Sequence, residues 1–421
     1  MSQASTSIRN TSIDDAIAAD QQDPLAEKRL TFKMPENVIY LDGNSLGPLP
    51  IKAQERARDV VDHQWGNDLI TSWNKHSWID LPEQAGNKIA RLIGANEGEV
   101  ICCDSISVNL FKLLAIALQM NSGRTEILSQ NDNFPTDLYI TQGLNALVGE
   151  NRCELQTVPA DEILDAMSEN TAVLMLTQVN FRTGHCHDMK QITEHAQAKG
   201  IIVIWDLAHS TGVMPLEMNI WGVDFAVGCG YKFLNGGPGA PAFVFAAKKY
   251  HQHLSQPLSG WMGHKAPFKF SPDYEADPSI KQFLCGTPPI ISMSVLDAAL
   301  DSFMDVEVSE LRTKALALAD FFHAQLEAHG LTNELNRQTP QPHALRGAQL
   351  SYSHPQAYEI CQALIAQDVI ADFRAPDIIR FGFSPLFLSF EEMYVAVQRL
   401  ADIMQAESYK AAKFQTRGKV T

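Results

Sequence analysis

Runs of strand length and stretches of helical pattern alternate from about residue 99 to residue 247, and this alternation restricts the fold more than any other feature of the sequence. Ile201–Trp205 is a run of five apolar residues, which is typical of a parallel strand buried on both faces. Helical patterns over residues 108–120 and 188–199 separate such runs. The alternation predicts an α/β protein with a parallel or mostly parallel sheet and helices on both faces.

The rest of the chain predicts a smaller α+β domain. The pattern is helical from Ser292 to about His329, and strands and helices of shorter length alternate after it, over residues 347–352, 357–367, 369–373 and 378–383. Near the start, residues 12–31 have the pattern of a short amphipathic helix with Ser12 as its N-cap. We expect three parts, namely an N-terminal segment (1–36) that packs with the small domain, a large domain (37–295) and a small C-terminal α+β domain (296–421).

The composition is that of an ordinary globular enzyme and argues against several kinds of partner. Of the 421 residues, 45% are hydrophobic and 19% are charged, which is typical of soluble proteins with a sizeable core. The 33 basic and 49 acidic residues give a formal net charge of −16, which disfavours nucleic acid and anionic membranes as partners. No stretch reaches the roughly 18 apolar residues of a spanning helix, and residues 1–36 lack the apolar core of a signal peptide. We therefore expect a cytoplasmic protein.

Seven cysteines are scattered along the chain, and none forms a CxxC pair. Neither a disulfide framework nor a structural zinc site is expected from this pattern. One segment needs separate consideration, because Cys186 lies between two histidines in HCHD, residues 185–188. A metal site needs further ligands that converge on it, and Asp188 has instead the character of a helix start. We expect no metal here.

Lys232 lies in the stretch GCGYKFLNGGPG, residues 228–239, with an apolar run on each side. A lysine on a turn between two buried strands is partly desolvated, which favours the neutral, nucleophilic amine that carbonyl chemistry requires. Lys232 is therefore our candidate for a covalent link to pyridoxal phosphate. On this stretch alone, a loop lysine paired with an acid explains the pattern equally well.

Asp206 supplies the second half of this prediction. It ends the apolar run in IIVIWDLAHSTG and so lies at the carboxyl end of a strand, where open α/β sheets place their ligands. A carboxylate there can keep the pyridine nitrogen of the cofactor protonated, so that the ring accepts electrons. Asp206 and Lys232 are 26 positions apart (232 − 206), which leaves room for one strand to leave the site and another to return. An aspartate in DLAH, followed by a lysine at this distance, resembles the fold-type I pyridoxal-phosphate enzymes.

Two helix starts add candidates for holding the cofactor. Residues 104–107 (DSIS) lead into a helix whose free N–H groups suit a phosphate, with Ser107 as a further donor, although a plain N-cap would use the same residues. In NDNFPTD, Phe134 precedes a proline and Asp137 begins a helix. Phe134 either stacks on a flat cofactor ring or belongs to the core beside the helix.

Three residues are candidates for binding the substrate. Arg380 lies in the apolar strand IIRFGF, where a guanidinium needs an anion, so it is either a clamp for a substrate carboxylate or half of a buried ion pair. Ser45 lies in the tight turn YLDGNSLGPLP and either contacts substrate or only shapes the turn. Trp73 either walls an aromatic substrate pocket or anchors packing.

With these residues in place, the chain resembles the kynureninase family of pyridoxal-phosphate hydrolases. The matching segments occur in the family's order and cover most of residues 38–290, and they are YLDGNSLG, VNLF, FPTD, VNFRTG, DLAHSTG, WGVDFAVGCGYKFLNGGPG and GTPP. DLAH and the lysine segment are shared with cysteine desulfurases, whereas FPTD, VNFRTG and GNSLG are much more specific to the kynureninase family. The resemblance implies fold type I, with a large domain around a seven-stranded, mostly parallel sheet and a smaller α+β domain.

The resemblance also implies a role for each matched residue. Lys232 would bind the cofactor covalently, Asp206 would pair with its pyridine nitrogen, and His209 would pack beside them. Phe134 would stack on the ring, and Asp137 would line the site. The phosphate and its surroundings would be held by Ile106, Ser107, Thr177 and Tyr231 of one subunit and by Trp261 and Thr287 of its neighbour. The resemblance thus implies a homodimer with a shared active site.

The implied activity is hydrolytic cleavage of the Cβ–Cγ bond of L-kynurenine to L-alanine and anthranilate, in tryptophan degradation or NAD biosynthesis. Arg380 would hold the α-carboxylate, and we hypothesise that Tyr231 is the acid-base group at the γ-carbonyl and the β-carbon. The sequence does not decide between kynurenine and its 3-hydroxy form.

Two other functions stay open. A cysteine desulfurase or selenocysteine lyase needs a mobile nucleophilic cysteine, whereas Cys361 falls within a helical pattern. A non-catalytic protein that only binds pyridoxal phosphate has no need of a carboxylate clamp such as Arg380.

Overall fold

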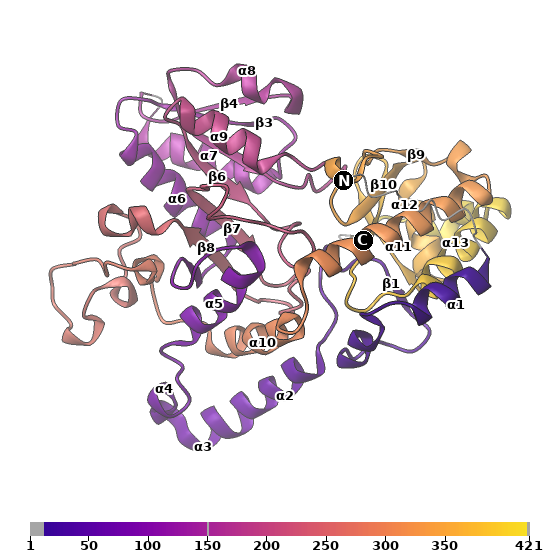
Figure 1. The fold of residues 1–421 in the computed structure, drawn as a ribbon, viewed down its shortest axis with the longest axis horizontal. Helices are drawn as coiled ribbons and strands as arrows, with labels where there is room; N and C mark the ends of the chain where they lie inside the picture. Colours follow the sequence, from indigo (N-terminus) through magenta and orange to yellow (C-terminus); the bar gives the residue numbers. More distant parts are fainter. Residues whose placement is uncertain (1–11, 150, 419–421) are drawn as a thin grey trace.

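The structure is a computed structural model that describes residues 12–149 and 151–418 (Figure 1). Its largest sheet has seven strands in the order β2-β8-β7-β6-β5-β3-β4. The strands from β7 to β4 are parallel, whereas β8 runs antiparallel to both β7 and β2. The bounds are β2 (Val100–Cys102), β3 (Glu126–Gln130), β4 (Glu154–Val158), β5 (Thr171–Thr177), β6 (Ile202–Asp206), β7 (Phe225–Cys229) and β8 (Ala242–Ala246). The prediction of a mostly parallel sheet is confirmed.

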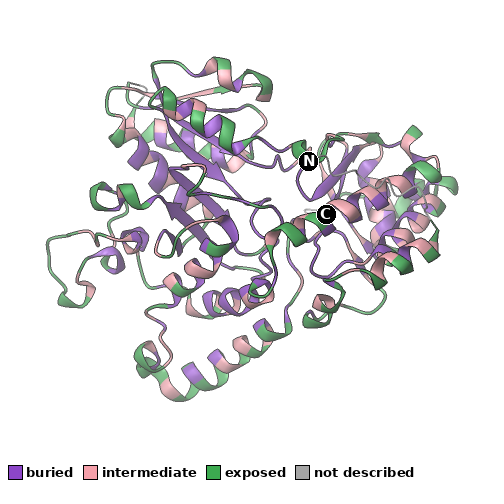
Figure 2. Ribbon diagram, viewed as in Figure 1, coloured by how far each residue is buried: buried purple, intermediate pink, exposed green. Residues whose placement is uncertain are grey.

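Helices cover both faces of this sheet, because its strands are apolar on both sides (Figure 2). Along β5, Leu174 and Leu176 belong to one hydrophobic core, and Val173 and Met175 belong to a second core on the opposite face. The first face is covered by α5 (Leu81–Ile93), α9 (Met189–Ala198) and α10 (Ile290–Leu300), and the second by α6 (Ile106–Met120) and α7 (Pro135–Val148). This arrangement leaves the strand ends as the place where polar side chains meet.

A four-stranded antiparallel sheet in the order β12-β13-β10-β9 forms the smaller part of the molecule. Its strands are β9 (Asn336–Arg337), β10 (Gln349–Ser353), β12 (Asp372–Arg374) and β13 (Ile378–Gly382). It packs with α11 (Val308–Ala328), α12 (Ala357–Ile365) and α13 (Phe390–Gln405). The predicted α+β part is therefore present, and Figure 1 shows it beside the large sheet.

Segments from the start of the chain lie against this smaller part. β1 (Ile39–Tyr40) pairs in parallel with β11 (Val369–Ile370). α1 (Ile13–Gln21) lies against α13, because the carboxylate of Asp20 accepts hydrogen bonds from the first two backbone N–H groups of that helix, at 2.7 and 2.9 Å. The limits 1–36, 37–295 and 296–421 for the three parts remain a prediction.

Two expected helices are shorter in the structure. The helix expected over residues 12–31 ends at Gln21, and a 3-10 turn follows at Ala26–Thr31. Pro24 lies between them and has no N–H to continue the helix, so the single-helix prediction was wrong. Likewise the pattern over residues 292–329 divides into α10 and α11, because Glu307 starts α11 with a capping box.

Among the elements that were not expected from the sequence are β4 and α13. β4 is an edge strand whose residues are all exposed or half-buried and include no apolar run, so its sequence carries little strand signal. α13 begins at a capping box between Ser389 and Glu392, a signal that the sequence does contain. Within residues 12–149 and 151–418, no helix combines the length and apolar character needed to cross a bilayer.

Candidate active site

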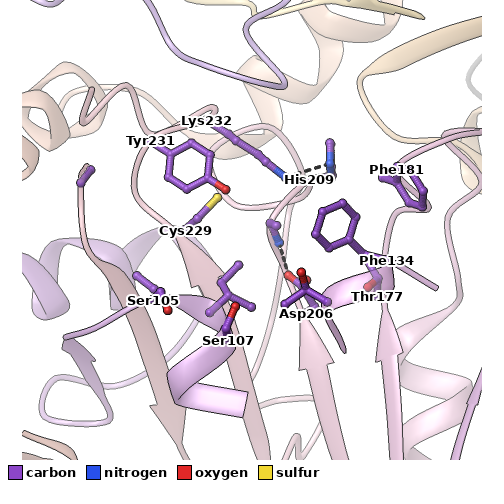
Figure 3. Close-up of a pocket in the computed structure, with 15 residues that line it drawn as sticks. Ser105, Ser107, Phe134, Thr177, Phe181, Asp206, His209, Cys229, Tyr231 and Lys232 are labelled. Atoms are coloured by element: carbon purple, nitrogen blue, oxygen red, sulfur yellow. Dashed lines mark hydrogen bonds between the residues drawn. The ribbon is translucent and has the colours of Figure 1, made fainter. Parts of the chain in front are cut away.

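A cavity of about 180 Å³ opens at the carboxyl ends of the parallel strands (Figure 3). β5, β6 and β7 reach it with their last residues, and the amino end of α6 and the turn after β7 complete its wall. It is lined by Ser105, Ile106, Ser107, Phe134, Thr136, Thr177, Phe181, Asp206, Ala208, His209, Cys229, Tyr231, Lys232, Ala240 and Ala242. The cavity therefore brings together most of the predicted cofactor residues, at the edge where α/β sheets bind ligands.

Lys232 lies on the turn after β7, and its side chain extends across the cavity (Figure 3). Its Nζ is 3.0 Å from Nε2 of His209 and 5.9 Å from the ring centroid of Phe134. In the described part of the chain, no carboxylate forms a salt bridge with this amine. This geometry speaks against the ion-paired loop lysine that the sequence left open.

Asp206 is the last residue of β6, and its side chain is buried at the base of the cavity. Its Oδ1 accepts a hydrogen bond of 2.7 Å from the backbone N–H of Ala208. Burial raises the pKa of the Asp206 carboxyl, while the Lys232 amine and the Ala208 N–H lower it. A positive group that approached this carboxylate would therefore stabilise its charged form.

Thr177 and Asp137 form a second polar group beside Asp206. The hydroxyl of Thr177 lies 2.5 Å from Oδ1 of Asn133 and 3.2 Å from Oδ2 of Asp137. Asp137 is fully buried behind the cavity wall, and burial together with the nearby Asp206 raises the pKa of its carboxyl. Phe134, which precedes this helix start, lies at the cavity and packs edge-on against Phe181 at 5.2 Å.

The amino end of α6 supplies backbone donors to the cavity. Ser105 is the N-cap of this helix, and its hydroxyl accepts from the N–H of Val108 at 3.4 Å. Ile106 and Ser107 follow as the first helical residues and line the cavity. Because Ser105 does the capping, the hydroxyl of Ser107 is not needed for it, and this helix start suits an anion.

Tyr231 precedes Lys232 and turns its hydroxyl toward the Cys229 thiol (Figure 3). Burial, together with Cys229 and Asp206, raises the pKa of this phenol above its usual value. The backbone carbonyl of Tyr231 accepts a hydrogen bond of 2.8 Å from the N–H of Gly47. The GNSLG turn is thus held directly against the lysine turn.

Arg380 is buried in β13 and forms an ion pair with Asp372 of the neighbouring strand. Its Nη2 also donates to the hydroxyl of Ser45 at 2.8 Å, and its Nη1 donates to the carbonyl of Phe181 at 2.5 Å. The ion-pair alternative therefore describes what the structure contains. Arg380 and Ser45 do not line the cavity, and their contact with a substrate carboxylate remains a prediction.

Three further predicted residues lie away from the cavity of their own chain. Trp73 lies in α4 (Ser72–Lys75) and packs edge-on against Trp78 at 6.0 Å, in agreement with the packing alternative. Trp261 is 40% exposed, and Thr287 is exposed as well. The substrate contact of Trp73 and the contacts of Trp261 and Thr287 with a neighbouring subunit remain predictions.

Several cavity residues were not singled out from the sequence, notably Phe181, Cys229, Ser105 and Thr136. Phe181 and Thr136 lie within VNFRTG and FPTD, so the motifs that carry the resemblance already contained them. Ser105 lies within DSIS, the helix start that the sequence predicted, whereas Cys229 carries no chemical pattern of its own and reaches the cavity because β7 ends beside α6.

The HCHD segment serves a structural role in the described residues. Asp188 caps α9 by accepting from the N–H of Gln191 at 3.0 Å, which confirms the predicted helix start. His187 lies 2.6 Å from Oε1 of Gln130, and the N–H of Cys186 donates to the carbonyl of Leu345. Across residues 12–149 and 151–418, no group of three or more His, Cys, Asp or Glu side chains is arranged to hold a metal ion.

Solved structures with the same architecture include cysteine desulfurases and the enzyme C-DES, one structure of which has glycine covalently linked to its PLP cofactor (TM-score 0.77 at 18% identity). The cysteine desulfurase from Thermococcus onnurineus NA1 has a TM-score of 0.76 at 16% identity and covers 90% of this chain and 98% of its own. The cysteine desulfurase CsdA from Escherichia coli has a TM-score of 0.72 at 17% identity, with 90% and 98% covered. At these identities the likeness shows the fold alone, and it confirms the predicted fold-type I architecture.

Sequence relatives are much closer. The family model described as the kynureninase C-terminal domain matches residues 311–400. Kynureninase from Burkholderia pseudomallei (strain 1106a) is 48% identical over 414 residues, which are 97% of this chain and 99% of that protein. Kynureninase from Pseudomonas fluorescens is 45% identical over 415 residues, which are 98% of this chain and 100% of that protein. Identity at this level over nearly the whole length shows that the chain belongs to the kynureninase family.

Proposed function

We propose that the cavity binds pyridoxal 5'-phosphate and that the protein uses it to cleave the Cβ–Cγ bond of L-kynurenine with water, giving L-alanine and anthranilate. The observation that carries this proposal is that the Lys232 amine and the Asp206 carboxylate face one cavity, with the amino end of α6 in its wall. The near-full-length kynureninase relatives support the same activity.

The chemistry of the groups in the cavity fits this cofactor. Lys232 offers a primary amine to an aldehyde, and Asp206 offers a buried carboxylate to a protonated ring nitrogen. The amino end of α6 offers N–H donors to a phosphate. Nδ1 of His209 and Oδ1 of Asp137 are buried and have no hydrogen-bond partner among the described residues, so polar atoms for a ligand are present beside the cavity.

The residues around the cavity divide the reaction among them. When bound, the cofactor would stabilise negative charge that develops on the substrate carbons near the substrate amino group. Lys232 would anchor it, and the same amine, once released, would take the α-proton from the substrate and return a proton to the α-carbon that becomes Cα of alanine. Asp206 would keep the ring nitrogen protonated, because an ionised carboxylate in this buried place favours a positive partner.

Tyr231 is the proposed acid-base group for the second half of the reaction. Its raised pKa keeps the phenol protonated at neutral pH, so it can donate to the γ-carbonyl oxygen when water adds. When the Cβ–Cγ bond breaks, the phenolate would take a proton back from a hydroxyl of the hydrated γ-carbon, and the restored phenol would then give that proton to the β-carbon. The neighbouring Lys232 lies on the same turn, and both side chains line the cavity.

Arg380 and Ser45 are the proposed binding groups for the substrate α-carboxylate. A planar guanidinium can donate two parallel hydrogen bonds to a carboxylate, and the hydroxyl of Ser45 lies beside Nη2 of Arg380. Arg380→Ala should raise KM for kynurenine severely and leave the absorbance of the bound cofactor intact. Loss of the cofactor instead would mean that this residue serves the cofactor site.

The proposed assembly is a homodimer with shared active sites. Trp261 and Thr287 are exposed and absent from the cavity of their own chain, which agrees with a role at the cavity of a neighbouring copy. Trp73 is proposed as an aromatic wall for the substrate. A cytoplasmic location is proposed from the composition alone.

The decisive test is to supply purified protein and pyridoxal phosphate with kynurenine, 3-hydroxykynurenine or cysteine in separate reactions. Formation of anthranilate or 3-hydroxyanthranilate supports the proposal, and the faster of the two reactions identifies the preferred substrate, whereas sulfide release would support a desulfurase.

The desulfurase alternative is disfavoured because Cys361 is buried in α12, where burial raises its thiol pKa. Cofactor absorbance without turnover would indicate a non-catalytic binding protein, and borohydride reduction that labels no lysine at position 232 would refute the anchor.

A further inference from the structure

We propose that Asp372 is the positioning residue of the substrate carboxylate clamp, which fixes the guanidinium of Arg380, and that Arg374 supplies the second positive charge that keeps Asp372 in place. This inference rests on the proposed role of Arg380 as the clamp. It assigns the orientation of that clamp to a residue that lies behind it.

Asp372 and Arg380 are directly opposite each other on the adjacent antiparallel strands β12 and β13. Oδ2 of Asp372 accepts from Nη2 of Arg380, from Nη2 of Arg374 at 2.8 Å and from the hydroxyl of Ser45 at 3.0 Å. The side chains of Asp372 and Arg380 are 2% and 1% exposed. The register of the sheet therefore sets this ion pair, and solvent does not screen it.

The plane of the Arg380 guanidinium is held from three distant parts of the chain. Nη2 donates to Asp372 and to Ser45, and Nη1 donates to the carbonyl of Phe181. Nε is buried and has no hydrogen-bond partner among the described residues. A guanidinium has five N–H donors in one plane, so these fixed contacts leave oriented donors for a further acceptor.

The carboxylate of Asp372 also stabilises the positive charge of the buried Arg380 guanidinium. Burial lowers the pKa of the Arg380 guanidinium, and the carboxylate of Asp372 is the main group that opposes this effect. Arg374 and Arg380 together carry two positive charges beside one carboxylate. Asp42 lies near the same group, and burial followed by the charge of Asp372 raises the pKa of its carboxyl to about 6.

A competing role for Asp372 gives the opposite result. If its carboxylate merely occupied the place of the substrate carboxylate, its removal would strengthen substrate binding. Asp372 is, however, also held by Arg374 and by Ser45, and its backbone is fixed in β12. A group held in this way orients its partner, so its removal should weaken binding.

The test is Asp372→Asn, which keeps the shape of the side chain and removes its charge. We expect KM for kynurenine to rise at least about tenfold while kcat stays within about threefold, because the substrate carboxylate loses an oriented partner. Kynuramine, which is kynurenine without its α-carboxylate, should inhibit the variant and the original protein with equal constants. The affinity for pyridoxal phosphate, followed by absorbance, should stay unchanged.

A matched control is Asp23→Asn. Asp23 forms a buried ion pair with Lys314 at 2.6 Å, with side chains 3% and 7% exposed, and neither residue lines the cavity. The Asp23→Asn variant therefore measures the effect of breaking a buried ion pair that has no contact with Arg380. KM for kynurenine should stay unchanged in this variant. If Asp372→Asn does not fold, Arg374→Gln removes the second positive charge that holds Asp372 in place, and KM should rise several-fold, about three- to tenfold.

The outcomes separate this inference from the function on which it rests. An unchanged or lower KM in Asp372→Asn, or an unchanged KM in Arg374→Gln where that variant replaces it, overturns the positioning role. A parallel loss of kynuramine binding overturns it as well, because the effect would then not involve the carboxylate. Arg380→Gln tests the clamp itself. If Arg380→Gln leaves KM unchanged, the clamp assignment fails, and if it raises KM selectively while Asp372→Asn does not, only the positioning role fails.

Discussion

The Lys232 amine lies 3.0 Å from Nε2 of His209, and this contact determines which nitrogen of the imidazole carries the proton. Burial, followed by the positive charges of Lys232, Arg380 and Arg374, lowers the pKa of His209 well below 6.5. The ring is therefore neutral, and an Nε2 that accepts from the amine leaves the proton on Nδ1. Nδ1 is buried and has no hydrogen-bond partner among the described residues.

This neutral histidine predicts a loss of stability in acid. The folded-state pKa of His209 lies below its unfolded value of 6.5, so the unfolded chain takes up the proton first. Stability from this residue is complete above pH 6.5 and falls as the pH drops from there toward the folded pKa, by up to about 1.4 kcal/mol per pH unit. His209→Gln should reduce this slope, as measured by urea unfolding of the cofactor-free protein between about pH 8 and about pH 5.

Two other variants calibrate this result. Burial and His185 lower the pKa of His187 to about 4, so His187→Gln should reduce the slope in the same direction. His253 is exposed, and His253→Gln should leave the slope unchanged. A slope that His209→Gln does not alter would show that the imidazole has the same pKa in the folded and unfolded chain, and that burial does not lower it.

Gly47 is the point where the GNSLG turn touches the lysine turn. A Cβ at this position would lie 2.5 Å from the carbonyl oxygen of Lys232 and 2.6 Å from Cα of Asn235, both of which belong to the backbone. Gly47→Ala should therefore push the two turns apart, with a loss of about 1–3 kcal/mol in stability and weaker cofactor binding. Unfolding by urea and titration with pyridoxal phosphate would measure the two effects.

Gly143 provides the matched control for this substitution. It lies exposed in α7, and a Cβ there would meet no atom within 4 Å. Gly143→Ala should leave cofactor binding unchanged and stabilise the helix by about 0.5–1 kcal/mol. Equal behaviour of the two variants would mean that the turns do not press on each other as the structure shows.

Much of the site was predictable because its residues follow recognisable strand ends and helix starts. Asp206 ends an apolar run, and Lys232 follows the next strand, so chain order alone places both at one sheet edge. The choice between an ion pair and a clamp at Arg380 was not predictable, because Asp372 meets it only through the register of β12 with β13. Phe181 was missed for a similar reason, since its position depends on contacts with a distant strand.

The fold was predictable where apolar periodicity was strong and failed where a single residue overrode it. The pattern over residues 12–31 is amphipathic throughout, yet Pro24 ends the helix within it. β4 lies at the sheet edge, where one side is exposed and an apolar run is not required. Apolar periodicity therefore predicts buried helices and strands well, but it predicts the ends of helices and the positions of edge strands poorly.

Tyr231→Phe tests the acid-base role of the phenol. The ring stays in place, so KM and cofactor binding should change little, while loss of the proton donor should lower kcat by about 10²- to 10⁴-fold. Steady-state kinetics with kynurenine measures both parameters. Tyr139→Phe, at an exposed position of α7, should have no effect, and a Tyr231→Phe variant with full kcat would remove the phenol from the mechanism.

Complementation between inactive variants tests the shared dimer. Lys232→Ala inactivates the cavity of its own chain, whereas Thr287→Ala should damage only the cavity of the neighbouring copy, because Thr287 is exposed and does not line its own. Subunits mixed in equal amounts after reversible dissociation should form mixed dimers with one intact site, which restores about one quarter of the original activity. Mixing Trp261→Ala with Thr287→Ala should restore no activity beyond that of the separate variants. Both residues are proposed to serve the cavity of the neighbouring subunit, so each cavity of the mixed dimer receives one altered residue. Activity that does not recover in the first mixture, despite confirmed subunit exchange, would mean that each chain completes its own site.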